Sequence, residues 1–168
     1  PPGQNKLSVF VSPVIVPLNL PIAAARGAGN IVSITSSNLG ASSYAGPGAG
    51  RFPTANSVAS DLVRLALGHA SPPFPYDRDW AMEPDFTAAF YCRITCKDGL
   101  GIIKRVGELA EVNGVSIHAI HQNPIEDPAH VDFVVTTDPC RLSQIEKFTD
   151  SIEKEAWAKQ RPLFMSLL

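Results

Sequence analysis

Three glycines lie within five residues in the segment 44–62, YAGPGAGRFPTANSVASDL, just before a helical pattern begins. Glycine leaves no side chain between main-chain N–H groups and a ligand, and Pro47 stiffens the segment. A dinucleotide-binding G-x-G-x-x-G motif needs a preceding strand, a tight turn and an acidic residue about 20 positions later. Gly46, Gly48 and Gly50 do not have that spacing. The segment alone is therefore not a free-standing dinucleotide-binding site.

Two cysteines and two histidines lie close enough in sequence to raise the question of a metal site. Cys92 and Cys96 fall in one expected strand, and His118 and His121 fall in another. Residues four apart on a strand are separated by roughly 13 Å. Residues three apart on a strand point to opposite faces. We expect no metal site. The odd count of three cysteines, without the spacing of a disulfide framework, favours a reducing compartment.

A second glycine-containing turn, Asp98-Gly99-Leu100-Gly101, joins an expected strand to an expected helix. Its glycines allow main-chain N–H groups to approach a carboxylate, and the partial positive charge of a helix N-terminus favours an anion there. This chemistry suits an amino-acid ligand. A tight connector that binds nothing explains the same residues equally well.

The chain divides into two halves at a proline-rich stretch, 69–86, which contains four prolines and no sustained periodicity. We expect domains at 1–68 and 87–168, with 69–86 as the linker. The sequence begins with Pro1 rather than methionine, so we expect a processed product or a piece of a longer chain.

The pattern of the second half predicts a ferredoxin-like β-α-β-β-α-β domain. Expected strands cover 88–96, 115–122, 131–137 and 162–168, and expected helices cover 102–112 and 140–154. Asn113-Gly114 is a typical helix end. Helices on one face of an antiparallel sheet leave the other face bare, so we expect these domains to pair.

The first half predicts an incomplete α/β segment. Residues 6–17 and 29–38 have strand patterns, and 53–67 has a helical pattern with Pro53 in its first turn. Val58, Leu62, Leu65 and Ala66 form the expected core stripe of that helix. Thr54 is expected to cap the helix rather than to contact a ligand.

The second half resembles an ACT domain, a family of small-molecule sensors carried by metabolic enzymes. The similarity covers 88–168 and is strongest in RITCKDGLGIIKRVGELAEVNGVSI, where Leu100 replaces the usual proline. The resemblance implies an amino-acid effector at a subunit contact. The residues that it implies for effector binding are Asp98, Gly99, Leu100, Gly101, Asn113, Val115 and Ser116.

The glycine segment resembles the signature near the end of the catalytic region of homoserine dehydrogenases. The matching residues are Tyr44, Gly46, Gly48, Ala49, Gly50, Pro53, Thr54, Ala55, Val58, Asp61 and Leu62. Many members of that family carry a C-terminal ACT domain, so two resemblances occur here in the family's order. A departure is Leu20, which stands where many members have histidine.

This resemblance implies NAD(P)-dependent interconversion of homoserine and aspartate semialdehyde, with Gly46, Gly48 and Gly50 against the nicotinamide side of the cofactor. It also implies threonine as the effector and a homodimer or homotetramer. The family's Rossmann fingerprint and catalytic lysine precede the signature, and Lys6 is the only lysine before it here. We therefore assign no catalytic residue, and we expect this chain alone to be inactive and to bind no cofactor. A stand-alone ACT-type binding or dimerisation module is the alternative.

Composition excludes several other classes of function. A net charge of −2 provides no basic field for nucleic acid. The apolar stretches are broken by proline and fall short of the roughly 20 residues that span a bilayer. We expect a cytoplasmic protein without nucleic-acid or membrane partners.

Overall fold

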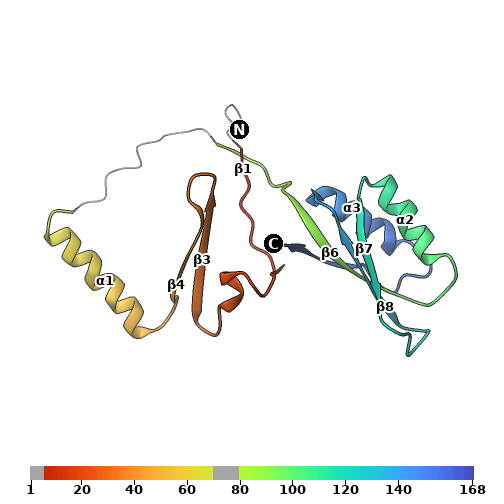
Figure 1. Cartoon of the computed structure of the whole chain (residues 1–168), viewed down its shortest axis with the longest axis horizontal. Coiled ribbons are helices and arrows are strands. Elements are labelled where there is room, and N and C mark those ends of the chain that lie inside the picture. Colours follow the sequence, from red (N-terminus) through yellow and green to blue (C-terminus); the bar gives the residue numbers. More distant parts are fainter. Residues whose placement is uncertain (1–5, 70–79) are drawn as a thin grey trace. The chain divides into compact units, whose positions relative to one another are not determined.

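The computed structural model describes residues 6–69 and 80–168, and contacts divide them into two compact units. One unit combines the first residues, through Ile15, with Trp80–Leu168, and the other runs from Val16 to Asp79 (Figure 1). Most of the predicted linker, 70–79, lies outside the described residues. The predicted boundaries 1–68, 69–86 and 87–168 therefore stay predictions.

The C-terminal unit has the predicted order of elements around one antiparallel sheet. Its main elements are β6 (Thr87–Cys96), α2 (Ile102–Val112), β7 (Ile117–Gln122), β8 (Val131–Thr137), α3 (Leu142–Glu153) and β10 (Leu163–Leu167). The strand order β10-β6-β8-β7 is that of a split βαβ unit. The short β9 (Cys140–Arg141) also pairs with β6.

The first residues of the chain add one strand to this sheet and form a second, two-stranded sheet with β5. β2 (Val14–Ile15) pairs in parallel with β10, and β1 (Lys6–Leu7) pairs in parallel with β5 (Ala81–Met82). The predicted single strand over 6–17 is thus wrong, because only its two ends find strand partners. Between them, Phe10 stacks on Phe86 with ring centroids 3.9 Å apart.

The core of the C-terminal unit lies between the sheet and its two helices. Every second residue of β6 from Phe90 to Cys96 points into it, as do Phe133 and Val135 of β8. From α3, Ile145, Phe148 and Ile152 are fully buried, as the helical spacing predicts. Burying such side chains contributes roughly 1.5–3 kcal/mol each.

Both ends of α2 are fixed by glycine. Gly101 adopts φ 85° at the N-cap, a left-handed conformation that other residues rarely adopt. At the other end, Val115 N–H donates to the Ala110 carbonyl at 2.9 Å and Gly114 N–H donates to the Glu111 carbonyl at 3.0 Å. This pair of bonds is a Schellman motif, which confirms the predicted Asn113-Gly114 helix end.

The second unit consists of a β-hairpin, a short 3-10 helix at Pro21–Ala24 and the helix α1 (Arg51–Ala66). The hairpin pairs β3 (Gly29–Ser36) with β4 (Gly40–Pro47). The sequence did not predict β4, because its serine, alanine and glycine residues have low strand propensity. Gly40, at φ 69°, makes the tight connection possible.

The predicted core stripe of α1 is wrong for this chain. Val58, Leu62 and Leu65 are 56%, 62% and 64% exposed, and Tyr44 of β4 is 63% exposed. None of the residues 16–69 is buried. A hairpin and one helix leave too little surface to cover an apolar stripe, since burial rises with the size of the domain.

No helix in the two described stretches is long and apolar enough to cross a membrane.

Candidate functional site

The glycine segment runs from the end of the hairpin into α1. Gly46 and Pro47 are the last residues of β4, and the Gly48 N–H donates to the Ala28 carbonyl at 2.9 Å. Gly50, at φ 124°, is the N-cap residue of α1. Gly46 and Pro47 therefore belong to the strand, and the connection to α1 begins at Gly48.

The three glycines differ in what surrounds them. A Cβ on Gly48 would lie 1.7 Å from Asn30 Nδ2, so Gly48 is needed for packing within the hairpin. A Cβ on Gly46 would meet no atom within 4 Å. Gly46 is thus the glycine whose missing side chain leaves room for an outside group.

The N-terminus of α1 has no side-chain cap within the described part of the chain. Thr54 is the fourth helical residue, and its N–H donates to the Gly50 carbonyl at 3.1 Å, so the predicted Thr54 cap is wrong. Pro53 lies in the first turn of α1, as predicted. Because a helix leaves its first N–H groups without helical partners, the amides of Arg51 and Phe52 can donate hydrogen bonds to an external acceptor such as an anion.

The second candidate region, the turn 98–101, leads into α2. The Asp98 N–H already donates to the Pro128 carbonyl at 2.8 Å, and the Leu100 side chain is fully exposed. A cavity of about 160 Å³ lies beside Asp98, Gly99 and Ile102. That volume is below the roughly 300–1,000 Å³ of small-molecule sites.

The remaining predicted effector residues lie at the opposite end of α2. Its 11 residues put them about 16 Å from the turn. Asn113 Nδ2 donates to the Leu109 carbonyl at 2.7 Å, Ser116 Oγ donates to Asp138 Oδ2 at 2.6 Å, and Val115 is buried. One copy of the chain therefore does not bring the two predicted clusters into one pocket.

Asp138 joins Ser116 to His118 at the start of β7. Its carboxylate accepts from Ser116 and lies 3.2 Å from His118 Nδ1. These two contacts, with that of Ser116 the larger, lower the pKa of Asp138. All three side chains are exposed to solvent. Their contacts link the start of β7 to the residue that follows β8. Sequence reasoning had no signal for it beyond the spacing of Ser116 and His118.

The three thiols belong to the core. Burial raises the pKa of Cys92 to about 12 and also raises the pKa values of Cys96 and Cys140. A thiol with so high a pKa carries almost no thiolate at neutral pH and is a poor nucleophile or metal ligand. His118 and His121 are exposed on β7, away from the buried thiols.

Comparison with solved structures gives the class of fold. The chain is similar to a homoserine dehydrogenase from Thiobacillus denitrificans, with a TM-score of 0.83 at 24% identity over 98% of this chain and 40% of that chain. A Staphylococcus aureus homoserine dehydrogenase gives a TM-score of 0.57 at 16% identity over 93% of this chain and 36% of that chain. The molecule therefore has a mixed α/β fold found within these dehydrogenases.

Sequence comparison finds the same family. The homoserine dehydrogenase family model matches residues 3–63. Homoserine dehydrogenase of Bacillus subtilis is 33% identical over 129 residues, which are 73% of this chain and 30% of the relative. That of Pseudomonas aeruginosa is 31% identical over 136 residues, which are 74% of this chain and 31% of the relative. The chain is thus similar to homoserine dehydrogenases over about three quarters of its own length. It spans about a third of the length of these relatives.

Proposed function

We propose that this chain is the C-terminal part of a homoserine dehydrogenase, a cytoplasmic enzyme that interconverts L-homoserine and L-aspartate 4-semialdehyde with NAD(P). This reaction belongs to the route to threonine, methionine and isoleucine. The observation that carries the proposal is the glycine segment 44–62, which lies wholly within the family match over 3–63.

In the parent enzyme, the end of β4 and the start of α1 support the cofactor. NAD(P), when bound, accepts or supplies the hydride. The open space at the missing Cβ of Gly46 would leave room for part of the cofactor, and the first amides of α1, which follow Gly50 and have no side-chain cap, would be available to it. Gly48 holds the hairpin against Asn30 and so positions both neighbours. This division of roles deepens the sequence prediction, in which all three glycines contacted the cofactor.

The exposed apolar surface of the second unit supports the proposal that this chain is part of a larger protein. A hairpin and a helix without any buried residue need another surface to cover Val58, Leu62 and Leu65. The missing nucleotide-binding part, or a second copy of the chain, supplies that surface in this proposal. The 168-residue chain alone then transfers no hydride, because near-attack geometry requires cofactor and substrate to be held together.

The C-terminal unit acts in this proposal as an ACT domain that binds threonine. Its strand order and the glycine turn 98–101 support the assignment. Because Asp98–Gly101 and Asn113–Ser116 lie at opposite ends of α2, the effector site needs one cluster from each of two copies. The domain is thus expected to bind threonine only as a homodimer or homotetramer.

Kinetics on the full product of the gene test the dehydrogenase proposal. We expect homoserine-dependent formation of reduced nicotinamide, inhibited by threonine, and no activity from the 168-residue chain. Absence of activity in the full product would overturn the enzyme assignment. Threonine binding to a protein without that activity would instead support the stand-alone sensor module, which the self-contained core of the C-terminal unit also permits.

A further inference from the structure

An apolar pocket opens between the N-terminal segment and the sheet of the C-terminal unit. The stacked rings of Phe10 and Phe86 form one wall together with Val11 and Ser12, and the end of β10 forms the other. Its volume is about 650 Å³, within the range of roughly 300–1,000 Å³ for small-molecule sites. A second pocket of about 410 Å³ adjoins it and shares Phe10, Phe86 and Ser166. Both lie within one compact unit.

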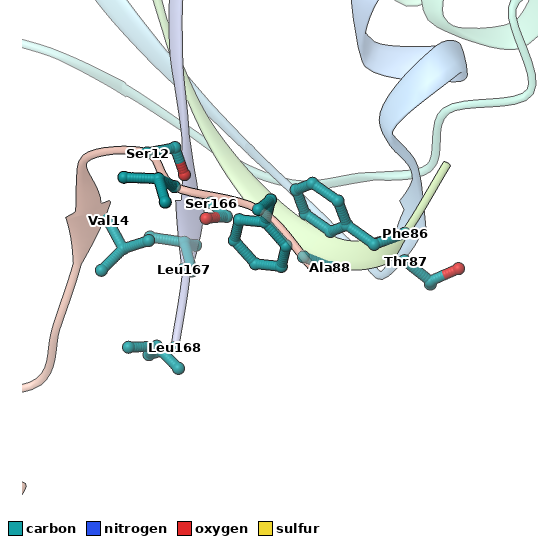
Figure 2. A pocket seen from close by; sticks show the side chains of 10 residues that line it. Ser12, Val14, Phe86, Thr87, Ala88, Ser166, Leu167 and Leu168 are labelled. Atoms are coloured by element: carbon teal, nitrogen blue, oxygen red, sulfur yellow. The ribbon is translucent and has the colours of Figure 1, made fainter. Parts of the chain in front are cut away.

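Ser166 gives this pocket a polar point. The residue is only 7% exposed, and its hydroxyl finds no hydrogen-bond partner among the described residues. Figure 2 shows the Ser166 oxygen in the middle of the lining side chains, with Ser12 and Val14 to one side and Phe86 to the other. A buried hydroxyl without a partner destabilises the folded state, so such groups in native proteins call for an explanation.

The composition of the walls defines the chemistry of a ligand. The side chains that line the two pockets are apolar except for the hydroxyls of Ser12, Thr87 and Ser166, and none of them is charged. An anionic group would lose its hydration without gaining a positive partner charge. A zwitterionic amino acid is thus a poor match for this site.

We propose that this pocket binds a neutral, mainly apolar small molecule whose single hydroxyl or carbonyl group bonds to Ser166 Oγ. The rings of Phe10 and Phe86 form the apolar wall beside it. The site shares no residue with the turn 98–101 or with the glycine segment, and it does not depend on the proposed dehydrogenase activity.

Three related probes test the proposal on the 168-residue chain: 2-naphthol, naphthalene and 2-naphthoate. NMR titration should show 2-naphthol shifting the amide signals of Ser166 and Leu167 with saturation, naphthalene binding more weakly, and 2-naphthoate not binding. Ser166→Ala should weaken 2-naphthol binding by about 2- to 10-fold, the effect of one neutral hydrogen bond, and leave naphthalene binding unchanged.

Two tryptophan variants separate filling of the pocket from general damage. Ser12→Trp should abolish binding of both neutral probes because its ring occupies the pocket. Ser37→Trp, in the hairpin turn, should change neither binding nor the circular dichroism spectrum. Absence of 2-naphthol binding to the wild type, or equal binding to the wild type and Ser166→Ala, would overturn the proposal. Binding that persists in Ser12→Trp would place the probe elsewhere and overturn it as well.

Discussion

At the scale of residues, single backbone positions decide how α2 begins. Gly101 has φ 85° there, whereas Gly107 sits within the helix with open space around the position of a Cβ. The two glycines therefore place opposite demands on a side chain. Gly101 must adopt a left-handed backbone conformation, which a side chain disfavours. Gly107 has an ordinary helical backbone and only raises the conformational entropy of the unfolded chain.

We expect Gly101→Ala to lower the free energy of unfolding by about 1–2 kcal/mol, the cost of a left-handed conformation. Gly107→Ala should raise it by roughly 0.5–1 kcal/mol, because alanine favours a helix interior. Urea denaturation of both variants measures the two effects. A loss of stability in Gly107→Ala as large as that in Gly101→Ala would contradict the backbone argument.

Asp85 holds the start of α3 from a distance of 58 residues in sequence. Its carboxylate accepts from the Ser143 N–H at 2.8 Å and from the Ser143 hydroxyl at 2.9 Å. These bonds, that of the Ser143 N–H first, lower the pKa of Asp85, and the Arg141 guanidinium adds to the effect. No local sequence pattern predicted this contact, because the partners meet only in the folded chain.

The lowered pKa of Asp85 predicts how its contribution depends on pH. The ionised carboxylate favours the folded state, so its contribution is complete above the ordinary pKa of about 4 and disappears as the pH falls through the lowered folded value. The difference in urea midpoint between wild type and Asp85→Asn should thus be larger at neutral pH than in acid. Asp61→Asn, on exposed α1 in the other unit, is the matched control substitution. A pH-independent difference for Asp85→Asn would contradict the assignment.

At the scale of elements, local signals predicted most of the C-terminal unit. Alternating apolar residues identify β8, the helical spacing of Ile145, Phe148 and Ile152 identifies α3, and Asn113-Gly114 marks the end of α2. Such local signals could not predict the pairing between strands that are distant in sequence. The two residues of β2 join β10 across the whole length of the chain, and nothing in their local pattern specifies a parallel partner.

The β2–β10 pairing predicts a local loss of protection when the first residues are removed. The Leu168 N–H donates to the Ile15 carbonyl at 3.1 Å. In a variant lacking residues 1–15, hydrogen exchange at Leu168 should become fast, while amides in the β6–β8 ladder stay protected. Unchanged exchange at Leu168 would show that β2 does not pair there, and loss of protection throughout would show that the unit needs its first residues to fold.

At the scale of the whole molecule, all fully buried side chains of the described residues belong to the C-terminal unit. The second unit contains the family's glycine segment but no core of its own. The sequence predicted the α1 helix correctly and its burial wrongly, because periodicity shows which face is apolar but not what covers that face. In the proposed parent enzyme, another part of the protein or a second copy covers that face.

The most direct test of the account compares two valine variants of β4 in the full product of the gene. Gly46→Val should leave the melting temperature unchanged, since its Cβ meets open space, but lower kcat/KM for homoserine oxidation at least about tenfold by keeping the cofactor from the main chain. Ala41→Val, in the same strand, should have no effect. Full activity of Gly46→Val would contradict the proposed role of the glycine segment.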